Sequence, residues 1–193
     1  MTGRTHDVIA FTSLVAIFAY SNPPPHLSLA TLIVAVGANQ IGSLFPDIDQ
    51  PTSHLWKHVP VGSVVGRILS PLLGGHRFIS HSLLGVIIVG MLLMPLLNII
   101  HNVLLVNMDV VWFAFMNGYI CHLIADTFTH DGVPWLFPLP IRFGIPPFKF
   151  MRIKSGGKIE KLIIFPAFVL LTGYIFYLKY EFFLKYIHEY VKR

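Results

Sequence analysis

The sequence predicts an all-α fold, a multi-pass membrane bundle of about four to five spanning helices with two long cytoplasmic loops. The composition supports this prediction, because 54% of the 193 residues are hydrophobic and only 12% are charged, whereas about a quarter of a soluble domain is charged. Several apolar stretches also approach the roughly 20 residues that a helix needs to cross a hydrocarbon core about 30 Å thick. A water-soluble fold of this size could not bury so much apolar surface.

Four apolar stretches account for the spanning helices. They are Leu27 to Phe45, Leu83 to Val106, Val110 to Ala125 and Leu162 to Leu178. The third is short for a span unless Leu123 to Phe128 extends it. A fifth stretch, Val8 to Tyr20, would be about 20 Å long as a helix with a rise of 1.5 Å per residue. It is either a partial span or a helix sheltered by the others.

The chain, residues 1–193, is expected to form a single domain, because no repeat or low-complexity linker divides it. Pro23 to Pro25 closes the first connection between helices, and Val106 to Asp109 makes another tight one. Two long loops remain, Pro46 to Ser82 and Thr127 to Lys161. With five crossings, the N-terminus and both long loops would share one side of the membrane.

Basic residues are distributed unevenly between the two sides that this topology defines. The long-loop side carries ten: Arg4, Lys57, Arg67, Arg77, Arg142, Lys149, Arg152, Lys154, Lys158 and Lys161. The opposite side carries four: Lys179, Lys185, Lys192 and Arg193. Because cytoplasmic loops carry the excess of Lys and Arg, the long loops are expected in the cytoplasm.

The basic stretch Arg142 to Lys161 lies just before the last span. It would hold its loop at anionic lipid headgroups, or it would form a basic rim for a phosphate-bearing substrate. Membrane lipids are therefore the expected partners. A nucleic-acid partner is not required, because the chain lacks the polarity of a single-strand binding platform.

Eight ionisable residues lie at or near the ends of the apolar stretches, on the long-loop side. They are His6, Asp47, Asp49, His76, His81, His122, Asp126 and Glu160. Imidazoles and carboxylates together suit zinc or manganese better than a purely hard or purely soft ion. Their convergence predicts a metal site at the membrane surface, with about two divalent ions as cofactors.

His122 and Asp126 are the strongest local pair in this set. Four residues apart on a helix, they project from one face and can bind one ion or two adjacent ions. They could instead hydrogen-bond to each other and hold helices together. Ionisable groups at this depth are costly, which favours a functional role.

Pro46 is expected to end the second apolar stretch, so that Asp47 and Asp49 emerge at the membrane surface. Two residues apart in extended chain, both carboxylates would lie on one side and could flank metal ions. The pair could equally be a turn or a helix cap.

The next motif contains His76, Arg77 and His81, just before the longest apolar run. Ser80 or Ser82 could cap the helix that follows. Arg77 cannot be a metal ligand, but its planar guanidinium suits a substrate phosphate. A histidine-rich loop of this kind could also be merely interfacial.

His6 and Glu160 begin the first and the last apolar stretch. Each would be an ordinary interfacial residue if it stood alone, and each becomes a candidate ligand as part of the set. Five other histidines are weaker candidates for this metal site. His26 and His101 fall on the opposite side, His188 lies in the tail, and His54 and His58 lie in a loop.

Three sequence blocks follow one another in a fixed order: Pro-Asp-Ile-Asp at 46–49, His-Arg-x-x-Ser-His-Ser at 76–82 and His-x-x-x-Asp-x-x-Thr at 122–129. Together with His6, Gly132-Val133 and Glu160, they resemble the YdjM-like family of membrane-bound, metal-dependent hydrolases. The likeness spans nearly the whole chain. Membership would imply a multi-pass inner membrane protein with a metal-assisted hydrolytic site.

That family is in turn distantly similar to zinc-dependent phospholipase C and the related single-strand nucleases, whose zinc ions are held by His, Asp and a late Glu. The resemblance would assign these roles to His6, to Asp47 or Asp49, to His122 with Asp126, and to Glu160. The chain departs from the pattern four residues before Glu160, where it has Gly156 in place of a histidine.

The expected function is hydrolysis of a phosphoester of a lipid or lipid-linked substrate at the cytoplasmic membrane surface. Asp47 or Asp49 would be the base that orients the water, and Arg77 would bind the substrate phosphate. The alternative is a non-enzymatic membrane scaffold, or a transporter of metal ions or protons that uses the same cluster. A transporter should carry polar residues through the bilayer midplane, for which the candidates are Asn39, Gln40, Asn98 and Asn117.

Overall fold

The computed structural model describes residues 1–21, 27–50, 53, 56, 64, 66–67, 78–101, 105–139 and 141–191. The longer helices are α1 (Gly3–Tyr20), α2 (Leu29–Leu44), α5 (Leu83–His101), α6 (Met108–Thr127), α7 (Phe165–Leu178) and α8 (Tyr180–Val191). Four short helical turns are η1 (Phe45–Asp49), η2 (Ile79–His81), η3 (Lys149–Met151) and η4 (Glu160–Ile164), of which η4 is a π-helix. Within the described residues the only β-structure is two isolated bridges, so the predicted all-α class is confirmed.

In the part of the chain that the structure describes, four helical stretches are long and apolar enough to cross a membrane. They are Leu29–Asp49, Leu83–His101, Met108–Thr127 and Glu160–Leu178. The third predicted span is therefore longer than the marginal stretch Val110 to Ala125, because it continues to Thr127. The multi-pass prediction of about four to five spanning helices is confirmed, with four candidate spans among the described residues.

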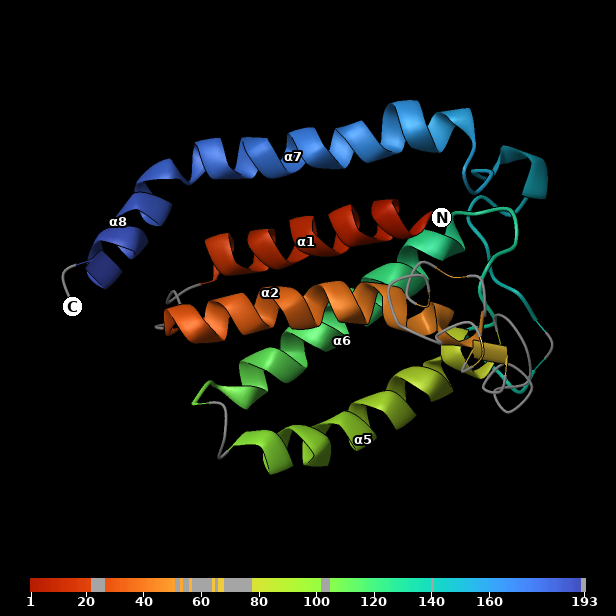
Figure 1. The fold of residues 1–193 in the computed structure, drawn as a ribbon. Coiled ribbons are helices and arrows are strands. Elements are labelled where there is room, and N and C mark those ends of the chain that lie inside the picture. Colours follow the sequence, from red (N-terminus) through yellow and green to blue (C-terminus); the bar gives the residue numbers. More distant parts are fainter. Residues whose placement is uncertain are drawn as a thin grey trace.

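The long helices run side by side, and α1 lies among α2, α6 and α7 (Figure 1). The N-terminus and the helix ends that flank both long loops lie at one end of the bundle, and α8 lies at the other (Figure 1). Residues that are far apart in the sequence therefore meet at the loop end.

Helix α1 packs against α2, α6 and α7, as expected if the fifth apolar stretch is sheltered by the other helices. It begins at Gly3, five residues before the predicted start, and it is not among the four stretches apolar enough to span. Its polar side chains bond to neighbouring helices: Thr12 Oγ1 lies 2.7 Å from Thr172 Oγ1 of α7, and Ser13 donates to Asn117 Oδ1 of α6 at 3.0 Å. These bonds satisfy groups that lipid could not.

Helices α2 and α6 pack most closely, through two glycines. A Cβ on Gly118 would lie 2.1 Å from the Asn39 carbonyl oxygen, and one on Gly42 would lie 2.1 Å from the Phe115 carbonyl oxygen. The Asn39 amide donates across the same contact to the Ala114 carbonyl at 3.0 Å. Small residues let the two backbones approach, as in other membrane helix pairs.

Side-chain caps fix where several helices begin. Ser28 accepts from the Thr31 N–H at the start of α2, and Asn107 accepts from the Val110 N–H at the start of α6. Ser82 accepts from the Gly85 N–H at 3.1 Å and so caps α5, which resolves the choice between Ser80 and Ser82. Helix α2 ends at Leu44, directly before Phe45-Pro46, as the proline predicts.

Helix α8 was not predicted from the sequence. It bends away from α7 (Figure 1) and packs its aromatic residues on the far end of α1, where Phe18 lies 5.6 Å from Phe182 and 5.0 Å from Tyr186 between ring centroids. Lys185 and His188 are exposed. The amphipathic pattern of α8 is the signal that could have found it.

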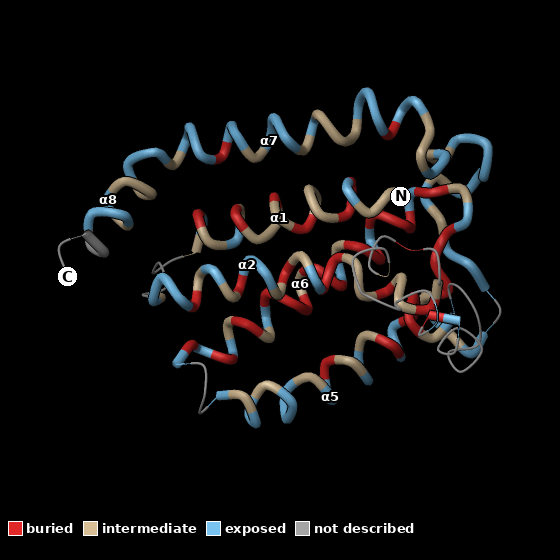
Figure 2. The backbone as a smooth tube through the Cα atoms, in the orientation of Figure 1, coloured by how far each residue is buried: buried red, intermediate tan, exposed pale blue. Residues whose placement is uncertain are grey.

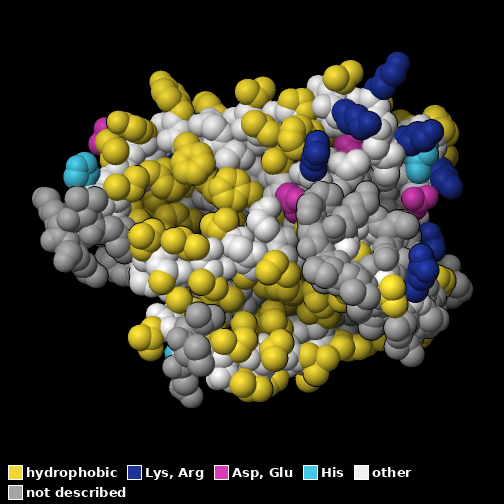
Figure 3. All heavy atoms as spheres, in the orientation of Figure 1, with side chains coloured by type: hydrophobic (Ala, Val, Ile, Leu, Met, Phe, Trp, Pro, Cys, Tyr) yellow, Lys and Arg dark blue, Asp and Glu magenta, His cyan; other side chains and the backbone are white. Residues whose placement is uncertain are grey.

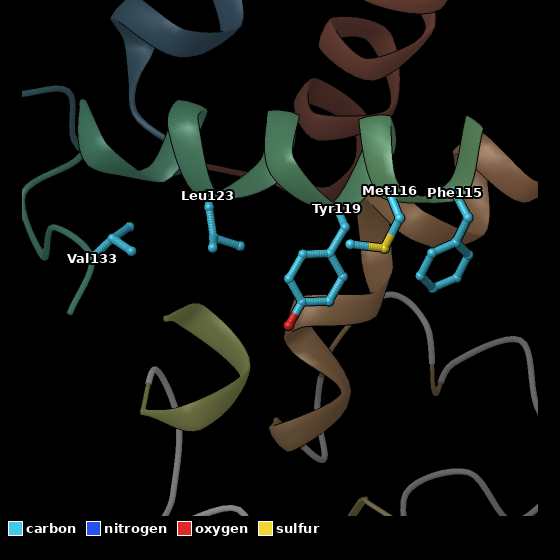
Figure 4. Close-up of a cluster of buried hydrophobic side chains, with 5 residues drawn as sticks. All are labelled: Phe115, Met116, Tyr119, Leu123 and Val133. Carbon is cyan, nitrogen blue, oxygen red and sulfur yellow. The ribbon is translucent and has the colours of Figure 1, made fainter. Parts of the chain in front are cut away.

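The outer helices expose their apolar side chains, whereas the interior holds the polar ones. Only 11% of the apolar window of α5 and 6% of that of α7 is buried inside the protein, and Figure 2 shows the contrast with α6. A small hydrophobic core adjoins the loop end, where Phe115, Met116, Tyr119 and Leu123 of α6 pack with Val133 (Figure 4). This arrangement places lipid outside and a polar site within the bundle.

Candidate metal centre

Five ionisable side chains from four elements meet inside the loop end of the bundle. They are His6 of α1, Asp47 of η1, His81 of η2, and His122 and Asp126 of α6. They form two overlapping groups, each with ligand atoms within 4.8 Å of one another: one contains His6, His122 and Asp126, and the other contains Asp47, His81 and His122. The cluster is therefore able to hold a metal ion.

The carboxylate of Asp126 faces three imidazoles. Its Oδ1 lies 3.3 Å from His6 Nε2, and its Oδ2 lies 3.8 Å from His122 Nε2 and 4.0 Å from His81 Nε2. Asp47 Oδ1 lies 3.7 Å from His81 Nε2 and 3.8 Å from His122 Nε2. Ligand atoms around tetrahedral zinc are about 3.4 Å apart for bonds of about 2.1 Å, so small side-chain movements would close the shell.

The imidazoles are buried without satisfying all their nitrogens. The rings of His6 and His122 stack with centroids 3.6 Å apart and an angle of 8° between planes. Both nitrogens of His6 and Nε2 of His122 have no hydrogen-bond partner, although His6 Nε2 lies close to Asp126. A buried polar atom without a partner costs about 1–3 kcal/mol, and a metal ion would remove that cost. The residues present therefore fit a metal ion.

Hydrogen bonds on the far side of two rings set their orientation. His122 Nδ1 lies 2.6 Å from the Ser43 carbonyl oxygen, so Nδ1–H donates there and Nε2 keeps its lone pair for the cluster. Ser43 is brought to this place by the glycine contact between α2 and α6.

His81 is held through a side-chain relay. Its Nδ1 lies 3.0 Å from Ser80 Oγ, and the Ser80 hydroxyl donates to Asp49 Oδ2 at 2.5 Å. The Tyr119 hydroxyl donates to the Ser80 carbonyl at 2.6 Å, which ties this turn to α6. Asp49 is thus buried behind His81, with Oδ2 3.7 Å from Nδ1, the nitrogen that faces away from the cluster.

The two aspartates of the Pro-Asp-Ile-Asp block point in different directions. Extended chain was expected there and is wrong, because Phe45–Asp49 forms a 3₁₀ helix. With three residues per turn, residues two apart do not share a side. Asp47 consequently faces the imidazoles of His81 and His122, whereas Asp49 faces Ser80.

Glu160, the first residue of η4, contacts the start of α1 and belongs to neither group of the cluster. Its Oε1 accepts hydrogen bonds from Thr2 N and Thr2 Oγ1, both at 2.7 Å, and from Thr5 Oγ1 at 2.6 Å. Its Oε2 accepts from Gly156 N at 2.7 Å. The carboxylate thereby anchors the first turn of α1, one turn before His6. The amino group of Met1 also contacts Asp126 Oδ1.

Two predicted site residues, His76 and Arg77, lie outside the described residues. So do His26, His54 and His58. Sequence reasoning did not single out the Ser43 carbonyl, Thr2 or Thr5. The hydroxyls of Thr2 and Thr5 donate to Glu160, which is far away in the sequence, and a backbone carbonyl leaves no signal in a sequence.

Comparison with known proteins gives the family. The sequence profile of the family described as YdjM inner membrane protein matches residues 1–182. The chain is 29% identical over 184 residues to the uncharacterized protein YvsG of Bacillus subtilis (strain 168), covering 94% of this chain and 98% of that protein. It is 29% identical over 178 residues to the inner membrane protein YdjM of Escherichia coli (strain K12), covering 88% and 80%. No solved structure matches. The chain belongs to the YdjM inner membrane protein family.

Proposed function

We propose that this protein is a metal-dependent hydrolase that cleaves a phosphoester of a lipid or lipid-linked substrate at the cytoplasmic surface of the inner membrane. One observation carries the proposal: His6 and His122 are buried, His6 Nδ1 and His122 Nε2 have no hydrogen-bond partner, and Nε2 of both rings lies within 4 Å of the carboxylate of Asp126. Buried nitrogens are normally paired in folded proteins, and metal ligation accounts for these.

The geometry suggests which residues would bind each of two ions, zinc or manganese. Asp47, His81, His122 and Oδ2 of Asp126 would form one site, and His6 with Oδ1 of Asp126 would contribute to a second. Asp126 would belong to both sets of ligands, because Oδ1 faces His6 and Oδ2 faces His81 and His122. His122 can serve only one ion, since Nδ1–H donates to Ser43 and only Nε2 remains.

Divalent ions held in this way would supply Lewis acidity for the attack of water on a phosphoester. Asp47 is the most exposed of the five side chains, at 18%, whereas the other four are at most 1% exposed. Water and substrate would therefore arrive beside Asp47, whose carboxylate can orient the water as a general base. Asp49 would act through His81, and Arg77 would bind the substrate phosphate.

The polar residues of the bundle interior favour a surface hydrolase over a transporter. Asn39 donates to Ala114 of the neighbouring helix, and Asn117 accepts from Ser13. These amides are engaged in helix packing. Asn98 is exposed on α5 and does not line a path with them.

The proposal is tested on the full chain in detergent, stripped by a chelator and reloaded with zinc or manganese. Metal content is measured by mass spectrometry, and phosphate release is measured on a panel of phospholipids and lipid-linked phosphates. We expect about two ions per chain in the wild type and about one in His6→Ala. His122→Ala should lose an ion and more than about 100-fold in rate.

The matched control is His188→Ala, because His188 is exposed at the other end of the bundle. This variant should keep both ions and full activity. Metal content that is equal in His122→Ala and His188→Ala would exclude the site. Metal uptake into vesicles that contain the protein would favour the transporter, because a surface hydrolase gives none.

A further inference from the structure

The loop between α6 and α7 combines exposed lysines with exposed aromatic side chains. We propose that residues 141–161 form a preformed surface that binds anionic phospholipid headgroups of the bilayer in which the protein is embedded. The lysines would hold lipid phosphates, and the side chains of η3 would enter the headgroup region. This inference does not rest on the proposed hydrolysis.

The position of the loop restricts it to the membrane surface. It leaves one candidate span at Thr127 and enters the next at Glu160. Both of its ends therefore lie where a hydrocarbon core would give way to headgroups. A surface at this depth lies next to the lipid phosphates, between the hydrocarbon core and the bulk water.

The charge of the loop complements an anionic membrane. Residues 132–159 contain no Asp or Glu. Five basic residues of the surface are exposed: Arg142, Lys149, Lys154, Lys158 and Lys161. Figure 3 shows Lys and Arg gathered at this end of the molecule. Each such residue close to an anionic leaflet strengthens binding by about fivefold.

The turn η3 presents large apolar side chains that nothing in the described part of the protein covers. Phe150 is 82% exposed, Phe148 is 62% exposed and Met151 is 57% exposed. Lys149 lies between the two phenylalanines. Alternation of aromatic and basic residues is the composition of interfacial segments that insert into the headgroup boundary.

The surface is held in place by bonds within the loop. Arg152 donates from Nε to the Pro146 carbonyl at 2.7 Å and from Nη2 to the Pro147 carbonyl at 2.8 Å. Val133 and Phe143 exchange two backbone hydrogen bonds, of 2.8 and 2.9 Å. Arg152 is thereby used inside the loop, and the exposed lysines are left to meet the lipid.

The first test measures lipid preference. The full chain in a neutral detergent is mixed with equal amounts of phosphatidylglycerol and phosphatidylcholine, and bound lipids are counted by native mass spectrometry. The triple variant Lys149→Gln, Lys154→Gln, Lys158→Gln should lose most of a preference for phosphatidylglycerol, about fivefold for each lysine. Lys185→Gln, which changes an exposed lysine at the other end, should keep it.

The second test locates η3 in nanodiscs and does not depend on charge. The Phe150→Trp variant should show added fluorescence that brominated lipid quenches and aqueous iodide does not. Quenching by iodide alone would overturn the proposal. So would an unchanged lipid preference in the triple variant, or binding of a soluble oligonucleotide or acidic peptide that depends on the three lysines without any preference for phosphatidylglycerol.

Discussion

Two serines of the His-Arg-x-x-Ser-His-Ser block have different roles, although they are only two residues apart. Ser80 connects Asp49 to His81 and so orients one imidazole of the candidate metal centre. Ser82 accepts from the Gly85 N–H and caps α5. Replacing each serine by alanine removes the same hydroxyl oxygen, so the two variants can be compared directly.

We expect Ser80→Ala to weaken metal binding by about 10-fold or more, because His81 loses the hydroxyl that fixes its ring. Ser82→Ala should leave metal affinity unchanged and cost about 1 kcal/mol of stability through the lost cap. Both affinities are measured by competition with a chelating dye. Equal metal affinities in the two variants would contradict the relay through Ser80.

The candidate site was predictable where spacing within one helix decides direction. His122 and Asp126 follow that rule, and the structure brings both together with His6, Asp47 and His81. Side chains whose direction depends on distant partners were harder to predict. The 3₁₀ turn directs Asp49 toward Ser80. Glu160 faces Thr2 and Thr5, more than 150 residues away in the chain, and no local pattern records that pairing.

Among the helices, the contact between α2 and α6 matters most for the site. It brings the Ser43 carbonyl to His122 and places η1 beside the last turns of α6. Gly118 has no space for a side chain in this contact. Gly37, also on α2, has that space, because a Cβ added there would meet no described atom within 4 Å.

Gly118→Ala should therefore force α2 and α6 apart. We expect a loss of about 1–3 kcal/mol in stability, together with weaker metal binding, because the support of His122 by Ser43 is stretched. Gly37→Ala should be neutral or slightly stabilising, since alanine favours the helix by up to about 1 kcal/mol. Unfolding in mixtures of mild detergent and dodecyl sulfate gives both values. A Gly118→Ala variant as stable as Gly37→Ala would show that the contact is loose.

Prediction of the elements succeeded where apolar length alone decides, as in α2, α5, α6 and α7. It left α1 undecided, because whether a short apolar stretch spans depends on what surrounds it. Helix α8 was missed, since its apolar side faces Phe18 on a different helix, and average hydropathy does not reveal such a face.

At the scale of the whole molecule, the two ends differ in chemistry. The loop end carries the candidate metal centre and most of the described basic residues, whereas the end with α8 carries Lys179 and Lys185. The excess of basic residues would place the loop end in the cytoplasm. That sidedness is a proposal that labelling can test.

We expect Lys154→Cys to react with a membrane-impermeant maleimide in inside-out vesicles and not in spheroplasts. Lys185→Cys should show the reverse, because it lies at the opposite end. The wild type, whose single cysteine lies within α6, gives the background. Labelling of Lys154→Cys in spheroplasts would place the long loops outside the cell.

The sheltered position of α1 has a consequence for biosynthesis. Its first turn is anchored by Glu160, and its middle bonds to Thr172, so its environment is completed by the last spanning helix to leave the ribosome. Until η4 and α7 have been made, α1 lacks the partners of its first turn and of its middle. A nascent chain that ends before Glu160 therefore lacks the hydrogen bonds that hold the first turn of α1, the turn that leads to His6.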